Sequence, residues 1–189
     1  MTAQESIRAA LAGAPVRPLH ATLVRCVALL PLTAGGTPDY LFTSGRANRY
    51  NPAGVECIYF SEDERTARAE YARRFGVGPG ALQPLGTYFA EVDLAGILNL
   101  EALPTRNALK LKTSDLTVRW ELARKTTRTQ LLGLVVSQQH AIAAIRFPSD
   151  AARAAGFLGF NIVIFPDCVR RPESVRILGP TKKPLQKWP

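Results

Sequence analysis

The residues best suited to chemistry in this chain lie in a polar loop, residues 44–54, with the sequence SGRANRYNPAG. The loop combines two arginines and two asparagines, whose side chains can donate hydrogen bonds to phosphate and ribose oxygens. Its glycines and its proline set the shape of the turn. It lacks the lysine of a P-loop, and the chain has no G-x-G-x-x-G sequence opening a helix after a strand. The loop therefore indicates either a site for a phosphorylated ligand or a solvated surface loop, and it does not indicate a doubly wound dinucleotide fold.

A helix is predicted directly after this loop and the short apolar run that follows it. Ser61 and Glu64 stand at the S-x-x-E spacing of a capping box, in which each side chain accepts a hydrogen bond from the backbone N–H of the other residue. Gly76 suits the left-handed position that often ends a helix. We therefore expect the helix to run from Glu62 to Phe75.

Glu70 is the carboxylate of interest on this helix. At 100° per residue, Ala67, Tyr71 and Phe75 form an apolar stripe, and Glu70 falls on its flank beside Arg74. Glutamate followed by arginine four residues later is also the favoured spacing of a surface ion pair. The spacing thus leaves two interpretations, a salt bridge with Arg74 or a functional carboxylate at the edge of the core.

Arg25 stands where the strand pattern favours an apolar side chain. In the segment LVRCV it shares a strand face with Leu23 and Val27. If that face is buried, the guanidinium needs a partner or an anion. The alternative is that the face is exposed near a sheet edge.

The other apolar segments predict an α+β fold. Short apolar runs bounded by Gly, Pro, Asp or Ser predict strands, and these are ATLVRCVALLP, GVECIYF, TYFAEVDL, AIAAIRF and FNIVIF. Helical spacing of apolar residues predicts two further helices, SIRAALAG and TQLLGLVVSQQ. No repeat or low-complexity linker divides the chain. We expect a single domain over residues 1–189, with a mixed sheet and short helices.

Composition narrows the class of protein. The chain has 189 residues, a formal net charge of +9 and a pI near 9.9, but its basic residues are spread out rather than gathered in one stripe. A positive net charge attracts nucleic acid, small phosphorylated ligands or an acidic protein partner. Cys26, Cys57 and Cys168 form no C-x-x-C pair, so neither a disulfide framework nor a metal site is expected. Without a signal-like N-terminus or a run of eighteen apolar residues, the protein is expected to be cytoplasmic and without membrane contact.

Several motifs occur in an order that resembles the RES domain family, which is named after an arginine, a glutamate and a serine. The family pattern of a strand arginine, GRWNPPG, L-Y-x-S and A-x-x-E resembles Arg25, NRYNPAG, IYFS and TARAE. Its later T-Q-x-x-G, I-R-Y-P-S-like and G-x-N-L-x-L-F-like motifs resemble TQLLG, IRFPS and GFNIVIF. The resemblance covers about residues 21–166, with the N-terminal helix and the basic C-terminal tail as extensions. Tyr50 departs from the family tryptophan, and Arg46 is an added cation that could take the place of Arg49.

The resemblance implies a fold similar to that of ADP-ribosyltransferase toxins and NAD as the substrate. Glu70 would stabilise the oxocarbenium-like centre formed when the nicotinamide–ribose bond breaks. Tyr59 would orient the nicotinamide by stacking, and Ser149 would hydrogen-bond the ribose or the nicotinamide. The residues expected to bind the phosphates, sugar or base are Arg25, Arg46, Arg49, Tyr50, Asn51 and Asn161.

The resemblance also implies a toxin of a bacterial toxin–antitoxin pair. Its antitoxin would carry a helix-turn-helix DNA-binding domain and block the NAD cleft, so nucleic acid would be met only through the antitoxin. Whether ADP-ribose passes to water, phosphate or a host protein target stays open. Two other classes stay open as well, a nucleic-acid-binding protein and a catalytically inert partner-binding module. Residues 96–125 and the basic tail match no motif that assigns them a role.

Overall fold

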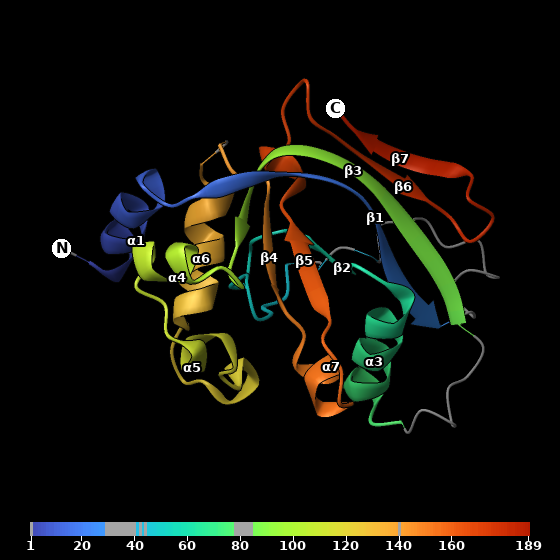
Figure 1. The fold of residues 1–189 in the computed structure, drawn as a ribbon, viewed down its shortest axis with the longest axis horizontal. Helices are drawn as coiled ribbons and strands as arrows, with labels where there is room; N and C mark the ends of the chain where they lie inside the picture. The colour runs from blue at the N-terminus through green and yellow to red at the C-terminus, as the bar shows by residue number, and fades with distance from the viewer. Residues whose placement is uncertain (1, 29–40, 42, 44, 78–84, 140) are drawn as a thin grey trace.

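In the described part of the chain, seven strands pair into one mixed sheet, drawn in Figure 1. The computed structural model describes residues 2–28, 41, 43, 45–77, 85–139 and 141–189. Among the described strands β3 and β4 run parallel, and the other pairs are antiparallel. The strands are β1 (Val16–Ala28), β2 (Ile58–Ser61), β3 (Leu85–Asn99), β4 (Ala144–Pro148), β5 (Phe160–Ile164), β6 (Ser174–Leu178) and β7 (Pro184–Trp188).

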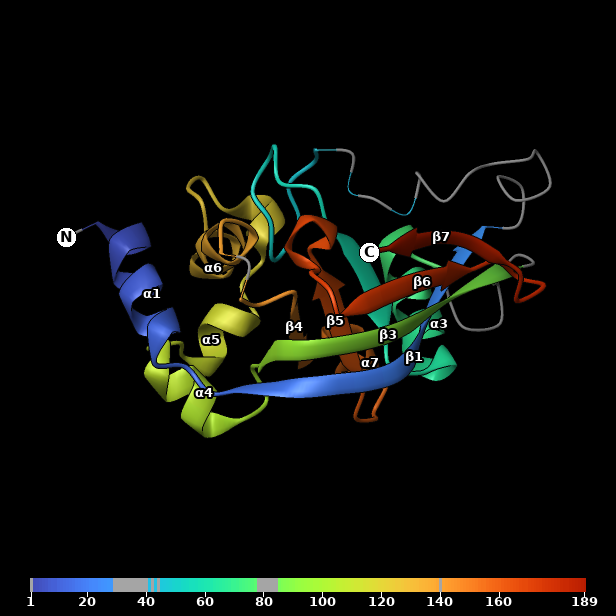
Figure 2. The same cartoon turned by 90° about the horizontal axis from the view of Figure 1, so that it is seen from above.

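Five of these strands, β1, β2, β5, β4 and β3, are paired in a closed ring. β1 pairs with β3 over residues 16–28, and these two long strands arch across the molecule (Figure 1). Between β1 and β2 the ring is completed by one residue pair, Val24 opposite Ser61. The β6–β7 hairpin lies outside the ring, because β6 pairs with the middle of β3 (Figure 2).

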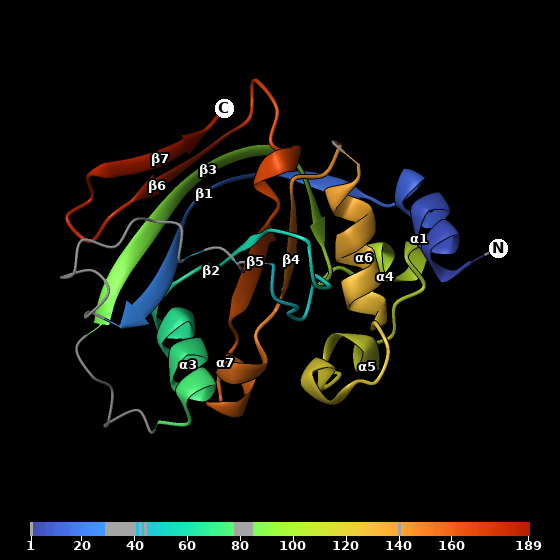
Figure 3. The same ribbon diagram turned by 180° about the vertical axis from the view of Figure 1, so that it is seen from behind.

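The helices form two groups at opposite ends of the sheet. Helices α1, α4, α5 and α6 gather at the end that carries the N-terminus, whereas α3 and α7 pack side by side at the other end (Figure 3). The carboxylate of interest therefore sits on a helix that is held against another helix and against β1. The helices are α1 (Ala3–Ala12), α3 (Glu64–Phe75), α4 (Leu103–Ala108), α5 (Thr113–Leu116), α6 (Arg128–Ser137) and α7 (Asp150–Ala154), with 3-10 turns η3 (Trp120–Leu122) and η4 (Pro166–Cys168).

Aliphatic side chains from the strands and from α1 and α6 fill the core. Leu23, Ile145 and Ile162 are completely buried, and α1 contributes Ile7 and Leu11. Each such side chain stabilises the fold by about 1.5–3 kcal/mol. The predicted mixed sheet with short helices is confirmed.

The three cysteines are free and buried. Burial raises the pKa of the Cys57 thiol to about 12 and that of Cys168 to about 11. Burial also raises the pKa of Cys26. All three thiols are therefore neutral and unreactive near neutral pH, as expected for small core residues.

Helix α3 begins later than predicted, at Glu64, and its N-cap is Asp63 rather than Ser61. The Asp63 carboxylate accepts hydrogen bonds from the Thr66 N–H at 2.7 Å and from the Thr66 hydroxyl at 2.8 Å. The predicted capping box is wrong because Ser61 belongs to β2, where sheet pairing outcompetes the local signal. The predicted end is confirmed, since Gly76 adopts φ of +63°.

Two other local predictions need correction. Phe75 was expected on the buried stripe of the helix, but it is 56 % exposed and its ring packs on Tyr71 with 4.5 Å between ring centroids. The strand predicted for GVECIYF is shorter than expected, because β2 begins only at Ile58 and residues 54–57 lie outside any strand. The predicted strand ATLVRCVALLP is described only as far as Ala28, and its last residues lie outside the described part of the chain. Ser44 of the polar loop also lies outside it.

The new cap assignment gives a first test. Asp63→Ala should lower the free energy of unfolding by about 1 kcal/mol, because the first turn of α3 loses its N-cap acceptor. Urea unfolding followed by circular dichroism measures this change, and Asp63→Asn, which keeps an acceptor, is the matched control. A loss in Asp63→Asn equal to that in Asp63→Ala would contradict the capping role.

Candidate active site

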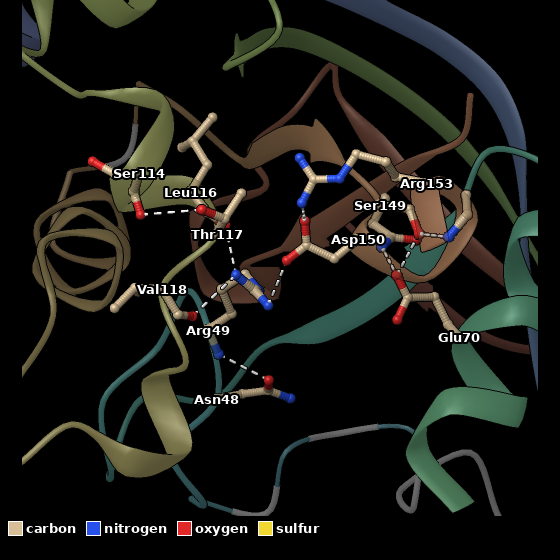
Figure 4. A network of polar contacts seen from close by, with 12 residues as sticks. Asn48, Arg49, Glu70, Ser114, Leu116, Thr117, Val118, Ser149, Asp150 and Arg153 are labelled. Carbon is tan, nitrogen blue, oxygen red and sulfur yellow. Dashed lines mark hydrogen bonds and ion pairs between the residues drawn. The ribbon is translucent and has the colours of Figure 1, made fainter. Parts of the chain in front are cut away.

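Glu70 is held at one oxygen by two side chains from distant parts of the chain. Its Oε1 accepts a hydrogen bond from Ser149 Oγ at 2.6 Å and another from Asn161 Nδ2 at 2.5 Å. Glu70 is half-buried, and Figure 4 shows its side chain reaching from α3 toward Ser149. Among the described residues no ion pair joins Glu70 to Arg74, so the surface salt-bridge interpretation is wrong.

Both donors are fixed by the elements that carry them. Ser149 is the N-cap of α7, and its Oγ accepts the Ala152 N–H at 3.0 Å while donating to Glu70. Asn161 lies in β5 and is 7 % exposed. Gly159, between α7 and β5, permits the close approach of α3, because a Cβ there would overlap Thr66 of α3. The carboxylate therefore has a defined position relative to the sheet.

Hydrogen bonds of the Asn51 and Tyr59 side chains hold the polar loop in its conformation. The Asn51 amide donates to the carbonyl oxygens of Arg46 at 2.8 Å and Val55 at 3.0 Å. Its Oδ1 accepts the Tyr59 hydroxyl at 3.0 Å, and that hydroxyl in turn accepts the Tyr50 N–H at 3.0 Å. Burial raises the pKa of Tyr59, so its hydroxyl stays protonated and can donate to Asn51. The polar groups of Asn51 and Tyr59 thus shape the loop.

Tyr50 is completely buried, and its ring lies 4.2 Å, centroid to centroid, from that of Phe147. Its hydroxyl has no hydrogen-bond partner among the described residues. Burial raises its pKa, which keeps this hydroxyl neutral. Tyr50 and Asn51 were both expected to bind the ligand, and in this structure the contacts of both side chains are to the protein itself.

Helix α6 packs against the same loop. Gln130 donates from Nε2 to the Asn48 carbonyl at 3.0 Å, while its Oε1 accepts the Thr127 N–H in the capping box that starts α6. Gly133 lies directly against the loop, because a Cβ there would overlap the Tyr50 carbonyl oxygen. The T-Q-x-x-G motif therefore has a structural role, which is to cap α6 and to seat the loop on it.

Arg49 clamps two segments together across the site. Its Nη1 donates to the carbonyl oxygens of Leu116 at 2.5 Å and Val118 at 3.3 Å, and its Nη2 lies 3.0 Å from Asp150 Oδ2. Asp150 also pairs with Arg153 at 2.7 Å, as Figure 4 shows. Asp150 follows Ser149 directly, so Arg49 and Glu70 lie on the two sides of the turn that begins α7.

Arg25 and Arg46 differ in whether their guanidinium groups are hydrogen-bonded to the protein. Arg25 is half-buried and donates from Nη1 to the carbonyl oxygens of Leu41 at 2.8 Å and Tyr59 at 3.1 Å. The guanidinium is thus partnered by backbone oxygens, from Leu41 ahead of the polar loop and from Tyr59 of β2. Arg46 is exposed, and its side chain makes no hydrogen bond or ion pair with the described part of the chain.

Eight of the nine predicted site residues fall into three sets. Glu70, Ser149 and Asn161 meet directly, and Arg49 reaches them through Asp150. The third set supports the adjoining loop and consists of Tyr59, Asn51, Tyr50 and Arg25. The ninth residue, Arg46, is exposed and belongs to none of these sets. Sequence reasoning assigned no site role to several residues that position these sets. Two motifs carried a signal for them, IYFS for Ser61 and TQLLG for Gln130 and Gly133, whereas Asp150 had none.

Two grooves on the described surface lie away from these residues. One groove of about 590 Å³ lies over β1, β3, β6 and β7, with Glu91, Asp93, Arg176 and Lys187 in its walls. It includes none of the predicted site residues. Its wall charges are partly paired with each other, since Arg176 binds Glu91. No cluster of His, Cys, Asp and Glu that could hold a metal ion occurs in the part of the chain that is described.

The described helices include none with the length and apolar character needed to cross a bilayer.

Comparison with known proteins identifies a family and a solved structure with a similar fold. The chain is similar over 95% of its length to 96% of a chain in the M. tuberculosis MbcT-MbcA toxin-antitoxin complex, with a TM-score of 0.63 and 16% sequence identity, which shows a shared fold. No curated protein matches the sequence significantly. The RES domain model matches residues 24–185, and these include the strand arginine, the polar loop, Glu70, Ser149 and Asn161. The chain therefore belongs to the RES domain family.

Proposed function

We propose that this protein is the toxin of a toxin–antitoxin pair and that it cleaves the nicotinamide–ribose bond of NAD. Membership of the RES domain family and the fold shared with a toxin–antitoxin complex support the toxin assignment. The observation that carries the chemical assignment is the carboxylate of Glu70, fixed at Oε1 by two donors from β5 and α7. Its Oε2 has no hydrogen bond with the described residues.

Glu70 is suited to stabilising a developing positive charge. Breaking the bond between nicotinamide and ribose leaves an oxocarbenium-like carbon, and a positioned carboxylate stabilises it more than it stabilises uncharged ground-state ribose. The second oxygen of Glu70 can accept hydrogen bonds from the ribose hydroxyls while the first stays tied to the protein. Because the position of the carboxylate is set before the substrate arrives, little reorganisation is needed in the transition state.

Ser149 and Tyr59 would place the nicotinamide end of the substrate. The Ser149 hydroxyl donates its proton to Glu70 and accepts the Ala152 N–H with one lone pair. Its second lone pair remains to accept a hydrogen bond from ribose or from the nicotinamide amide. Tyr59 would orient the nicotinamide ring by stacking. Asn161 acts here on Glu70, which is where its amide already donates.

The phosphates would bind where the arginines of the polar loop meet the start of α7. Arg46 is the arginine whose guanidinium is available, whereas Arg25 and Arg49 hold backbone carbonyls and would add positive potential. A phosphate that reached Arg49 would compete with Asp150 for its Nη2. Tyr50 and Asn51 would act by keeping the loop in shape.

Arg46 and Arg49 should give different kinetic signatures. Arg46→Ala should raise KM for NAD about tenfold with little change in Tm, because one charged hydrogen bond of about 1.4 kcal/mol is lost. Arg49→Ala should instead lower the free energy of unfolding by about 1–3 kcal/mol, since Oδ2 of Asp150 and two carbonyl oxygens lose the donor that Arg49 supplies. Steady-state kinetics and thermal unfolding measure both, with exposed Arg17→Ala as the control. If Arg46→Ala leaves KM unchanged, Arg46 does not bind the phosphates.

The acceptor of ADP-ribose decides the name of the reaction. Water as acceptor gives free ADP-ribose, inorganic phosphate gives its phosphorylated form, and a side chain gives a modified host protein. The purified protein should be incubated with NAD alone, with phosphate and with host lysate, while nicotinamide release and labelled products are followed. Intact NAD under all three conditions would overturn the proposed reaction.

The proposal also includes a partner. An antitoxin with a helix-turn-helix DNA-binding domain would cover the site, and the net charge of +9 favours an acidic segment at the contact. Nucleic acid would then be bound through the antitoxin.

A further inference from the structure

A third side chain stands behind Asn161 in the hydrogen-bond chain that reaches Glu70. Ser61, the last residue of β2, is 4 % exposed and lies directly opposite Asn161 in the β2–β5 ladder. Its Oγ donates to Asn161 Oδ1 at 2.7 Å, and Asn161 Nδ2 donates to Glu70 Oε1 at 2.5 Å. The donation runs in one direction, from hydroxyl to amide to carboxylate.

The asparagine amide is the link whose orientation needs control. An amide has a donor side and an acceptor side of nearly equal size, so turning it by 180° exchanges NH₂ and oxygen without changing its shape. With NH₂ toward Glu70 the contact is a charge-assisted hydrogen bond. With oxygen toward Glu70 two acceptors face each other, and the carboxylate is repelled from Ser149 and from the sheet.

The hydroxyl of Ser61 selects between these two orientations. The Asn161 oxygen is buried, and in the observed orientation Ser61 supplies its hydrogen bond. Without that hydroxyl the buried Asn161 oxygen has no hydrogen-bond donor from β2, so the observed amide orientation is no longer favoured over the reversed one by this contact. Coupled hydrogen bonds also strengthen one another, so the donation from Ser61 polarises the amide toward Glu70.

We propose that Ser61 is a positioning residue for Glu70 and acts by locking the side-chain amide of Asn161 with its NH₂ toward the carboxylate. This inference rests on the proposed function for its kinetic consequence, and its structural content stands on the contacts of the three side chains. Ser61 itself touches neither Glu70 nor the substrate. A misoriented carboxylate slows the chemical step, whereas the binding of the phosphates and of the base is unaffected.

The kinetic test compares variants that differ in the hydroxyl. Ser61→Ala removes the hydroxyl without adding bulk. Ser61→Val and Ser61→Thr introduce side chains of the same shape, and of these two only threonine keeps a hydroxyl donor. We expect kcat for nicotinamide release to fall about 10- to 100-fold in Ser61→Ala and Ser61→Val, with KM for NAD within about twofold. Ser61→Thr should recover kcat to within about threefold of the wild type. An equal kcat in the valine and threonine variants, or a rise in KM alone, would overturn the proposal.

A second measurement separates this inference from the proposed function. The two side-chain NH₂ protons of Asn161 can be assigned by NMR in ¹⁵N-labelled protein through their loss in Asn161→Asp. We expect one proton shifted downfield by its hydrogen bond to Glu70 in the wild type and in Ser61→Thr, and this shift should be lost in Ser61→Val. If the shift persists in Ser61→Val, Ser61 does not lock the amide, whatever the activity. If the shift behaves as expected but no NAD is cleaved, the positioning chain stands and the proposed reaction fails.

Discussion

Glu70→Gln is expected to lower kcat for nicotinamide release from NAD by about 10²–10³-fold, the usual cost of removing one stabilising group from a transition state. The amide keeps the size of the side chain and can still accept hydrogen bonds from Ser149 and Asn161 through its oxygen. It carries no negative charge, however, so the oxocarbenium-like centre loses its counter-charge. KM should change little, because ground-state NAD has no positive carbon at the ribose for Glu70 to stabilise.

The measurement is steady-state nicotinamide release by the purified protein, with thermal unfolding to show that the variant is folded. Glu64→Gln is the matched control, since Glu64 lies on the same helix, is exposed and pairs with Arg68 instead of the site. Expression without an antitoxin should stop growth for the wild type and for Glu64→Gln, and Glu70→Gln should relieve the arrest. Equal growth arrest by all three proteins would remove the assigned role of Glu70 and favour a partner-binding or nucleic-acid-binding protein.

Gly133→Ala is expected to have the largest effect on stability, a loss of about 3 kcal/mol in the free energy of unfolding. The added methyl group would overlap the carbonyl oxygen of Tyr50, a backbone atom that cannot move without the loop. The loop is held on its other side by Asn51 and Tyr59, so it cannot shift away without breaking their hydrogen bonds. For a chain of this size the loss corresponds to a fall in Tm of roughly 6–12 °C.

Thermal or urea unfolding of the purified variant measures this effect. Gly13→Ala is the control, because a Cβ at Gly13 meets nothing within 4 Å and its φ of −107° suits any residue. We expect Gly13→Ala to change stability by no more than about 0.5 kcal/mol. A Gly133→Ala protein as stable as Gly13→Ala would mean that the loop does not need its close seat on α6.

The elements of this fold were predictable where the signal is local. Apolar spacing located α1 and α6, and Gly76 marked the end of α3. The start of α3 was misplaced because Ser61 and Asp63 both have side chains that suit an N-cap, and the choice depends on pairing with β5, about a hundred residues further along the chain.

The contacts of the candidate site could not be predicted from the sequence. The position of Glu70 on the flank of its helix followed from periodicity, but its partners lie 79 and 91 residues away in sequence. The order of motifs nominated Ser149 and Asn161 without showing that both bind the same oxygen. The contacts of Arg49 could not be foreseen, because the carbonyl groups of Leu116 and Val118 are backbone atoms and leave no trace in residue type.

The narrow join between β1 and β2 has a consequence for motion. A single residue pair connects these strands, and the Arg25 guanidinium spans the same boundary by donating to the Tyr59 carbonyl. Local opening is easiest where the fewest backbone hydrogen bonds must break, so this boundary is the natural hinge line of the ring. Opening there would leave the β2–β5 pairing that joins Ser61 to Asn161 unbroken, but it would act on Glu70, because α3 packs against β1.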